Sequence, residues 1–455
     1  RFNVPLQLAL LLTHAALIAS LDITQNTVSY GNLLTIGNIH IFPNVFWSIV
    51  NQPVQQFLGS LLNEGSLFIS TNNPLISLAV SFSGVLNNLV NTGNILFQSW
   101  NGFLTPSFNL AVASFQNSGN IWFNTYSSTF SPMYSILAPD WQNTGGIYLY
   151  LTRRGTSLVT LGGGTTINNS GQICLINEAW QQTTVIQGNG CIDVGENSAL
   201  WIANAILSFA QLQTINLSST TSAIRADIVS FPQTFTVSGY GGGNVVGVSL
   251  PITSWNYNPT TGILHLATGL TGLLSQNYNI GLGYDPSLFQ VVTYDFGAGI
   301  GTVINGGMQY NGPVPAQSTP PTYCTACLPP PAPPTDVLTT TTAPWTGTGT
   351  STSTISGSAP SGGTATDTII ILTPIPETTT TSGWTQSMTS TTTISGVSGA
   401  PNTVVILSPE AVSYTSWTGT GTSTSTIPAS GTNEATLVIL TPESLVTTTS
   451  GYTGT

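Results

Sequence analysis

Charged side chains are scarce in this sequence, and lysine is missing altogether. Only 4% of the 455 residues are charged, against about a quarter in an ordinary soluble protein. The only strong cations are Arg1, Arg153, Arg154 and Arg225, and the net charge is −11. Because nucleic acids and anionic lipids bind through clustered Lys and Arg, this composition argues against both as partners.

Histidines and converging carboxylates, the usual groups of catalytic and metal sites, are also few. His40 and His265 alternate with apolar neighbours, so both are expected to face outward from strands, and neither has a second histidine near it in the sequence. Asp193 and Glu196 lie three residues apart and would point to opposite faces of a strand. The remaining acidic residues of this region are equally dispersed: Glu64, Asp140 and Glu178. We therefore predict no catalytic residues, no cofactor and no metal, and expect a protein that is not an enzyme.

Long apolar runs are limited to the N-terminus. An apolar stretch over residues 4–18 follows Arg1 and precedes the small residues Ala19 and Ser20. It is shorter than the ~20 residues of a membrane-spanning helix and indicates a signal peptide over residues 1–20. A signal peptide predicts export to an oxidising compartment, where cysteines pair. The alternative is a buried apolar strand.

What the sequence has in abundance is one repeated motif. It reads "NEGSLFI", "NTGNILF", "NSGNIWF", "NTGGIYL" and "NSGQICL" in copies that begin at Asn63, Asn91, Asn117, Asn143 and Asn169. Indexed by glycine, seven copies lie at Gly37, Gly65, Gly93, Gly119, Gly145, Gly171 and Gly190, at intervals of 28, 28, 26, 26, 26 and 19 residues. Positions four before, two after and four after the glycine are apolar in all seven.

These three apolar columns predict a solenoid. Residues two apart on a strand face the same side, and a unit of about 26 residues buries its apolar face only by stacking on its neighbours. We predict a right-handed parallel β-helix with one motif per coil. The glycine would occupy a bend or a tight contact, and the asparagines would stack as an amide ladder, a structural role that we favour over a ligand-binding row. A leucine-rich repeat is less favoured because the dense leucine signature is missing.

The composition changes along the chain and sets the predicted domains. Residues 21–236 are expected to form the β-helix, and 237–311 a separate small β-sandwich-like cap that closes its open end. Residues 312–335 are rich in proline and predict a semi-rigid linker. Residues 336–455 form a Ser/Thr-rich stalk with no core of its own, in which "WTGTGTSTST" occurs at both Trp345 and Trp417. Its apolar segments "TIIILTP", "TVVILSP" and "TLVILTP" either zip between chains or form short strands of small repeat units.

Four cysteines suit two disulfides with three possible connectivities. Cys174 and Cys191 face outward in neighbouring copies, with Cα atoms ~8 Å apart in aligned coils, slightly too far for a bond without a register shift. The alternative is that each pairs with Cys324 or Cys327, which would pin the linker onto the domain. Both possibilities remain open.

Surface chemistry adds a few candidates. Asn168 in "NNS" and Asn216 in "NLS" are N-glycosylation sequons. The stalk favours O-linked sugars, which would stiffen it. Arg153 and Arg154 would either grip an anionic group or form a solvated corner, and the corner is favoured.

The motif "F/W-x-N-[ST]-G-x-I-x-[FL]", the segment "YNIGLGYDPSLFQ" and the closing "YCTAC" resemble the N-terminal domain of fungal hyphally regulated cell-wall proteins over about residues 21–327. The stalk resembles the repeats of yeast flocculins. The resemblance implies a secreted wall glycoprotein with a glycosylphosphatidylinositol anchor. No anchor signal follows Tyr452, and since the sequence lacks an initiator Met and stops inside a repeat, we expect the natural protein to continue.

The resulting functional prediction is an adhesin or adhesin-like protein of the fungal cell surface. Its expected partners are host-cell or abiotic surfaces, glycans or neighbouring copies of itself, with wall polysaccharide attached through the anchor. A purely structural wall mannoprotein is the second possibility. A polysaccharide lyase or hydrolase of the β-helix type is the third and least favoured.

Overall fold

The computed structural model describes residues 18–30, 34–71, 77–100, 105–126, 131–163, 166–269, 273–297, 299–335, 337–345, 350–355, 366–374, 378–384, 390–394, 403–409, 411–417, 422–427 and 436–442. They fall into two compact units, one reaching Val337 and the other beginning at Leu338. The predicted all-β class is confirmed. In the described ranges the helical turns are the 3-10 turns η1 (Pro286–Leu288) and η2 (Ala316–Ser318), and no helix there is long and apolar enough to span a bilayer.

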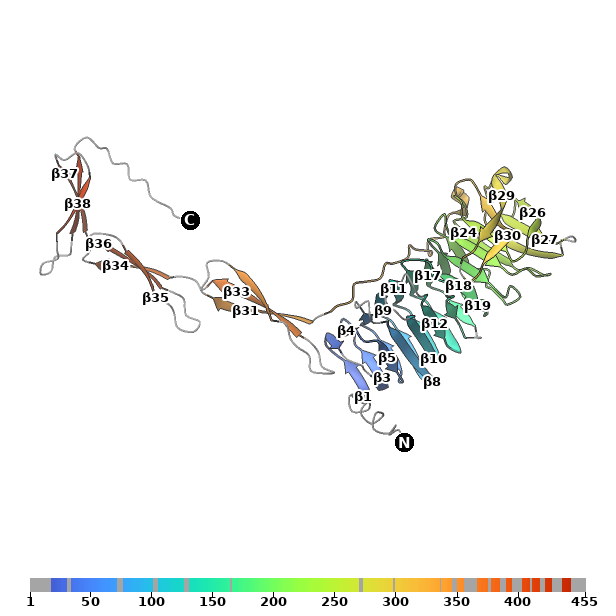
Figure 1. The fold of residues 1–455 in the computed structure, drawn as a ribbon, viewed down its shortest axis with the longest axis horizontal. Helices are drawn as coiled ribbons and strands as arrows, with labels where there is room; N and C mark the ends of the chain where they lie inside the picture. The colour runs from blue at the N-terminus through green and yellow to red at the C-terminus, as the bar shows by residue number, and fades with distance from the viewer. Residues whose placement is uncertain are drawn as a thin grey trace, which may run out of the picture. The chain divides into compact units, whose positions relative to one another are not determined.

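The first unit is a parallel β-solenoid (Figure 1), as predicted. Sheet A contains β1 (Ile18–Ile23), β3 (Leu34–Ile41), β5 (Val54–Phe57), β6 (Leu61–Asn63), β8 (Ala79–Asn91), β10 (Ser107–Asn117), β12 (Met133–Leu137), β13 (Asp140–Asn143), β15 (Thr160–Leu161), β16 (Ile167–Asn169) and β19 (Ile186–Gln187). Sheet B contains β2 (Thr27–Tyr30), β4 (Phe46–Val50), β7 (Ser66–Thr71), β9 (Asn94–Trp100), β11 (Asn120–Tyr126), β14 (Gly146–Leu151), β17 (Gln172–Ile176), β20 (Cys191–Val194), β22 (Thr214–Leu217) and β24 (Thr234–Ser238), and continues through β28 (Leu274–Asn279), β27 (Ile263–Thr268) and β26 (Ile252–Asn258).

A third sheet, sheet C, lines the later coils. It contains β18 (Ala179–Gln182), β21 (Ala199–Ile202), β23 (Ala223–Ala226), β25 (Val245–Val248), β30 (Thr302–Tyr310) and β29 (Phe289–Asp295). Within the described residues sheet A ends at β19. The early coils are therefore formed by sheets A and B, and the last coils before the cap by sheets B and C.

The predicted apolar columns stack in register. One column of sheet B consists of Leu67, Ile95, Ile121, Ile147, Ile173, Ile192 and Ile215, each directly opposite the next and each fully buried. The column two residues further on runs from Ile69 through Phe97, Phe123 and Leu149 to Leu175 in the same manner. Each coil buries its apolar face on the next, which is the source of the stability of a solenoid.

The first copy of the motif was assigned wrongly. Ile39 lies opposite Leu61 in sheet A, whereas the residue opposite Leu67 in sheet B is Trp47. Gly37 therefore does not belong to the glycine column of the later coils. It lies instead beneath Gly59, on which an added Cβ would come within 2.0 Å of the Gly37 carbonyl oxygen.

The other glycines are required by close approach of neighbouring coils. A Cβ built on Gly119 would lie 2.0 Å from the carbonyl oxygen of Gly93, and Gly145 meets Gly119 in the same way. The predicted asparagine ladder is also present. Buried Nδ2 atoms donate to the Oδ1 atom one coil further on, at 2.6, 2.7, 2.8 and 2.8 Å along Asn63, Asn91, Asn117, Asn143 and Asn169.

The cap is continuous with the solenoid and not a separate domain. The coil strands β24 and β25, partly inside the predicted cap, are still parallel to their predecessors. Sheet B continues with β28, which is parallel to β24, and then with the antiparallel strands β27 and β26. Sheet C continues with the antiparallel strands β30 and β29. Tyr240, Tyr257, Tyr284, Phe289 and Tyr310 pack together between the extensions. The boundary was misplaced because the coils beyond β20 keep the solenoid without the Asn-x-Gly motif.

The second unit contains three three-stranded sheets. They are β31 (Val337–Trp345), β33 (Thr366–Pro374) and β32 (Ser351–Ile355); β34 (Thr378–Trp384), β36 (Thr403–Pro409) and β35 (Ser390–Ile394); and β37 (Ala411–Trp417), β39 (Thr436–Pro442) and β38 (Ser423–Ile427). Each apolar segment forms the central strand of its sheet. This is the arrangement of small repeat units that the sequence left as one of two possibilities.

The predicted signal peptide falls mostly outside the described residues. Residues 18–20 belong to β1, which pairs with β3 through Ile23. The predicted end of the signal at residue 20 therefore overlaps the first strand by three residues.

Candidate functional site: the strap on the outer face of sheet B

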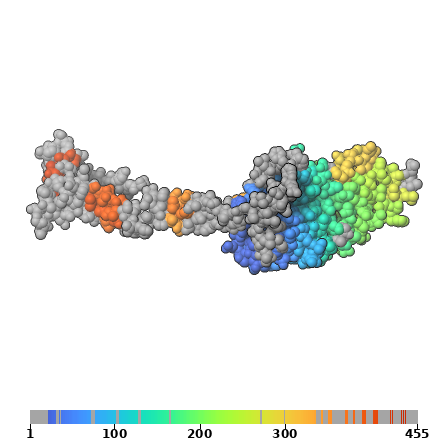
Figure 2. Space-filling view, turned by 60° about the horizontal axis from the view of Figure 1, so that its bottom comes forward, coloured from blue at the N-terminus to red at the C-terminus, as the bar shows by residue number. Residues whose placement is uncertain are grey.

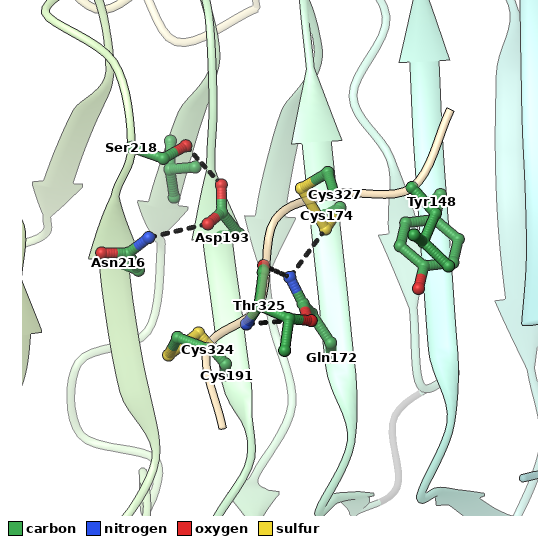
Figure 3. The surroundings of a disulfide bond; sticks show 12 residues. Tyr148, Gln172, Cys174, Cys191, Asp193, Asn216, Ser218, Cys324, Thr325 and Cys327 are labelled. Atoms are coloured by element: carbon green, nitrogen blue, oxygen red, sulfur yellow. Dashed lines mark hydrogen bonds between the residues drawn. A yellow bond between two sulfur atoms is a disulfide. The ribbon is translucent and has the colours of Figure 1, made fainter. Parts of the chain in front are cut away.

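The proline-rich segment predicted as a linker is bound to the solenoid along its length. Residues 318–335, called the strap below, cross the outer face of sheet B from the cap to the first coil (Figure 1), and Figure 3 shows the part held by the disulfides. At the cap end Gly239 N donates to Ser318 O at 3.2 Å. At the other end the Tyr30 hydroxyl in β2 donates to the Thr335 carbonyl oxygen. The strap contains a turn at Pro321–Cys324, and its other 14 residue steps cover ~43 Å when extended, which matches the ~43 Å between β24 and β2.

Two disulfides fix the middle of the strap. Cys327 bonds to Cys174 in β17 and Cys324 to Cys191 in β20, with Cα–Cα distances of 5.9 and 5.3 Å. Of the two possibilities that the sequence left open, the structure therefore has the one in which each solenoid cysteine holds the strap. Between the disulfides, Thr325 bonds to the side chain of Gln172 (Figure 3).

After a turn in which Cys324 N donates to the Pro321 carbonyl oxygen at 2.9 Å, the strap has the burial pattern of a polyproline II helix. From Cys324 to Pro330 every third residue is half-buried and the two between are exposed. Three residues per turn is the period of that helix, so one edge faces the sheet. A CxxC pair in this conformation spans ~9 Å, which matches the ~8 Å offset of Cys174 and Cys191 in neighbouring coils.

Beneath the strap lies an apolar column that the sequence analysis missed. Phe68, Leu96, Trp122, Tyr148 and Cys174 form an outward-facing cluster with Cys327. All five solenoid residues stand three positions after a motif glycine, so the signal was an apolar fourth column on the face expected to meet solvent. An apolar column on an outward face indicates that another segment of the chain covers it, and that inference was not made.

Hydrogen bonds add direction to this contact. Trp122 Nε1 and the Tyr150 hydroxyl both donate to the Leu328 carbonyl oxygen, at 3.0 and 2.9 Å. Burial raises the pKa of Tyr150 to about 12, with smaller effects from Tyr148 and Asp193. The phenol therefore stays protonated and remains a donor to the strap over the physiological pH range.

Two grooves lie against the strap over the glycine column. One, of 290 Å³, includes Gly119, Gly145 and Gly171 in its floor, with Tyr323 of the strap at its side. The other, of 380 Å³, lies nearer the first coil and is bordered by Pro334. A third groove, of 350 Å³, is on the outer face of sheet A and includes His40.

The acidic and histidine residues considered in the sequence have individual polar contacts. Glu64 accepts a contact from His40 Nε2 at 2.7 Å, and Asp140 accepts from Ser114 Oγ at 2.7 Å. Glu196 is exposed. His265 contacts Asn277 Oδ1 at 2.8 Å. Among the described residues no three His, Cys, Asp or Glu side chains gather in the manner of a metal site.

Two carboxyl groups are buried instead of solvated. Burial raises the pKa of Glu178 well above its ordinary value, against the opposing effects of the Ala179 backbone and Arg154. Burial also raises the pKa of Asp193, which accepts hydrogen bonds from Ser218 and Asn216.

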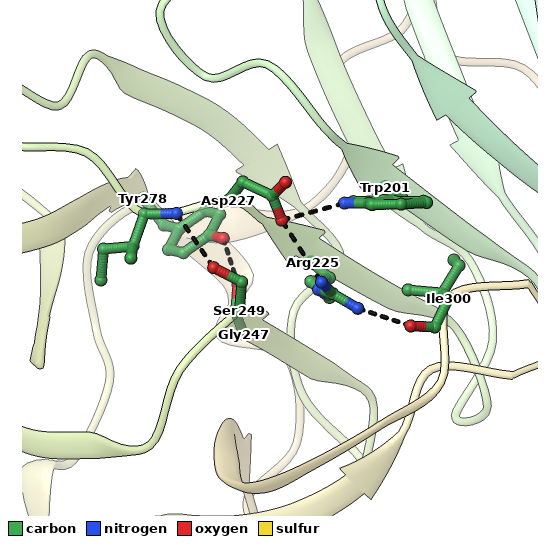
Figure 4. Close-up of polar contacts among 8 residues, drawn as sticks. Trp201, Arg225, Asp227, Gly247, Ser249, Tyr278 and Ile300 are labelled. Atoms are coloured by element: carbon green, nitrogen blue, oxygen red, sulfur yellow. Dashed lines mark hydrogen bonds and ion pairs between the residues drawn. The ribbon is translucent and has the colours of Figure 1, made fainter.

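The arginines divide between two roles. Arg153 is exposed, as the solvated-corner interpretation predicts. Arg154 instead donates to the Phe296 carbonyl oxygen of the cap. Arg225 donates to the Ile300 carbonyl oxygen at 2.6 Å and lies over the Trp201 ring at 5.0 Å (Figure 4). Arg154 and Arg225 thus hold the β29–β30 connection of the cap onto the solenoid.

The two sequons differ in accessibility. Asn168 is exposed on sheet A. Asn216 is 4% exposed; its Nδ2 donates to Asp193 at 2.7 Å and its Oδ1 accepts from Ser238 at 3.0 Å. The fold therefore argues against a glycan on Asn216, while Asn168 remains a predicted site.

Structural disulfides are typical of exported proteins. The β-solenoid with its disulfide-bonded strap is therefore of the class of extracellular domains. Comparison with known proteins identifies its family. The model of the hyphally regulated cell wall protein N-terminal family matches residues 11–334, so the chain belongs to this family, as its resemblance predicted. The match ends at the last proline of the strap and includes none of the second unit.

Curated relatives are cell wall proteins of Candida albicans. Cell wall protein IFF6 is 36% identical over 331 residues, which cover 70% of this chain and 30% of the relative. Hyphally regulated cell wall protein 3 is 33% identical over 77% of this chain and 28% of its own length. Cell wall protein IFF4 is 39% identical over 72% and 22%. The chain thus spans less than a third of these relatives. The predicted cell-wall location is confirmed, while the anchor, the signal peptide and the flocculin-like nature of the stalk stay predictions.

Proposed function

We propose that the first unit is the attachment head of a fungal cell-wall adhesin. The observation that carries this proposal is the course of the strap. It returns the chain from the cap to the first coil, so the chain leaves the head beside β2. The cap is then the end of the head farthest from the point where the rest of the chain departs, as the colour gradient along the solenoid in Figure 2 illustrates.

Display of the cap would explain why the strap runs back along the whole solenoid. A simple linker would begin at residue 312, at the cap, and would leave the cap beside whatever anchors the chain. The strap instead requires two disulfides and an aromatic groove to reverse that polarity. Presentation of the cap and of the solenoid flanks toward the outside is the arrangement that an attachment protein needs.

The proposal also holds that the head is not an enzyme. The relatives are named as cell wall proteins, and Glu64 and Asp140 contact a histidine and a serine. Incubation of the chain with pectins and glucans, with and without Ca²⁺, is expected to release no reducing ends or unsaturated products. Release of either would replace the proposal with a lyase or a hydrolase.

The direct test is attachment. The full chain is coupled to beads through its C-terminal end, and beads are counted on host cells, on polystyrene and on immobilised glycans under flow. Beads carrying the chain are expected to remain on at least one surface at shear that removes bare beads. Equal removal from all surfaces would refute adhesion and favour a purely structural wall protein.

A further inference from the structure

An exposed row of hydroxyls runs beside the strap. Thr92, Ser118, Thr144 and Ser170 each precede the glycine of their motif, and each is exposed. Their backbone amides bond to the asparagine ladder one coil earlier, which fixes their positions at one per coil, ~4.8 Å apart. The first three hydroxyls make only long contacts of 3.4, 3.5 and 3.4 Å to carbonyl oxygens. They retain the capacity to bind a ligand.

The glycine column makes the floor beside this row flat. No side chain rises from Gly119, Gly145 or Gly171, because a Cβ there would strike the coil beneath. The far side of the 290 Å³ groove is formed by Tyr148 and by Tyr323 of the strap, which is 50% exposed. The groove is therefore open, extends over three coils along the solenoid axis, and is bordered by hydroxyls on one side and by the exposed Tyr323 on the other.

The chemistry of the lining selects an uncharged ligand. None of the residues that line this groove is Asp, Glu, Lys, Arg or His. An anionic polymer would meet no cation there and would approach a chain of net charge −11. Hydroxyl groups repeated once per coil suit a polymer that carries its own hydroxyls at regular intervals, and the exposed ring of Tyr323 suits its less polar faces.

We propose that this groove binds an extended segment of a neutral polysaccharide, parallel to the solenoid axis. The inference rests on the proposed function, because an attachment head must recognise something, and it names the ligand class and the surface. The strap is part of the site, since Tyr323 is held beside the groove by the disulfide of its neighbour Cys324 and by the contact of its own hydroxyl with Thr214 at 2.8 Å.

The test measures binding of fluorescent hexasaccharides to the full chain in solution by fluorescence polarisation. Laminarihexaose and mannohexaose represent fungal wall polymers, lacto-N-hexaose represents a neutral host glycan, and hexagalacturonate is the charged control. Saturable binding of at least one neutral hexasaccharide is expected, with none of hexagalacturonate. The preferred neutral probe distinguishes a wall source from a host source.

Two variants locate the site. Thr144→Phe places a ring over the glycine floor and is expected to weaken binding by about tenfold or more. The matched control Gln142→Phe puts the same ring at an exposed position of the same coil on sheet A, and should change affinity less than about twofold. Both variants should show the circular dichroism and melting temperature of the native chain. Tyr323→Ala, which removes the side of the groove without touching its floor, should also weaken binding severalfold.

Three results would overturn the proposal: no binding of any neutral probe, equal binding of hexagalacturonate, or equal weakening by Thr144→Phe and Gln142→Phe. The bead assay separates this failure from that of adhesion. If native beads attach but no neutral hexasaccharide binds the chain in solution, the groove proposal fails and adhesion stands. If the groove binds sugar but no bead attaches, adhesion fails and the groove stands.

Discussion

Removal of the strap disulfides should destabilise the head in a strongly non-additive way. The Cys191–Cys324 bond closes a loop with a sequence separation of 133 and the Cys174–Cys327 bond one of 153. These separations differ by 20, so once either bond is present the other closes a loop of only about 20 residues. Loop-closure entropy assigns about 5 kcal/mol to the first bond formed and about 3 kcal/mol to the second.

The expected pattern follows directly. Cys174→Ser with Cys327→Ser, or Cys191→Ser with Cys324→Ser, should each lower the free energy of unfolding by about 3 kcal/mol. Removal of all four cysteines should lower it by about 8 kcal/mol, more than the sum of the two pairs. The assay is urea unfolding of the full chain, followed by tryptophan fluorescence under non-reducing conditions. A fourfold variant whose loss merely equals that sum would refute the reasoning.

Three further substitutions test other parts of the head. Glu178→Gln should flatten the pH dependence of the melting temperature. Burial raises the folded-state pKa of Glu178, so the native chain is stabilised as pH falls toward the ordinary pKa and loses that stability as pH rises through the folded-state pKa. An unchanged slope of melting temperature against pH in the variant would contradict this. Asn117→Ala breaks two ladder bonds and leaves buried partners unpaired, so urea unfolding should show a loss of about 2–4 kcal/mol, whereas exposed Gln116→Ala should cost less than about 0.5 kcal/mol. Arg225→Ala should cost about 2–3 kcal/mol and speed hydrogen exchange in the β29–β30 connection, and exposed Arg153→Ala should do neither; equal effects would exclude the proposed hold on the cap.

The solenoid could be predicted from the sequence because several columns of residues repeat with the same spacing. Each of Ile95, Ile121, Ile147 and Ile173 is informative only through its equivalents, and together they specify the register that the structure shows. The first coil was misaligned because Val45 takes the place of a glycine there, while an unrelated glycine preserved the 28-residue spacing. A column tolerates such a change at an end, where only one neighbour constrains it.

The strap was harder to predict because its contacts are not periodic. Leu328 meets Trp122 across 206 residues of sequence, and no local pattern in a proline-rich segment identifies its partner. Two indications did exist: the outward apolar column, and the ~8 Å offset that left Cys174 and Cys191 poorly placed to bond each other. Taken together, these two indications would have placed Cys324 and Cys327 on sheet B. The choice of partner within the pair required the direction of the strap, which only the cap position supplies.

The return path of the strap also decides how the head bears mechanical load. A pull on the chain beyond Thr335 first acts on Tyr30 and Ser48, then on Trp122, and peels these contacts one at a time. Peeling stops at the Cys327–Cys174 bond after the eight residues 328–335 have been released. Tension then enters the solenoid at β17, in the middle of the stacked coils, and the coils before β17 carry no tension. The bond acts as a mechanical stop that spares the first half of the solenoid from unravelling.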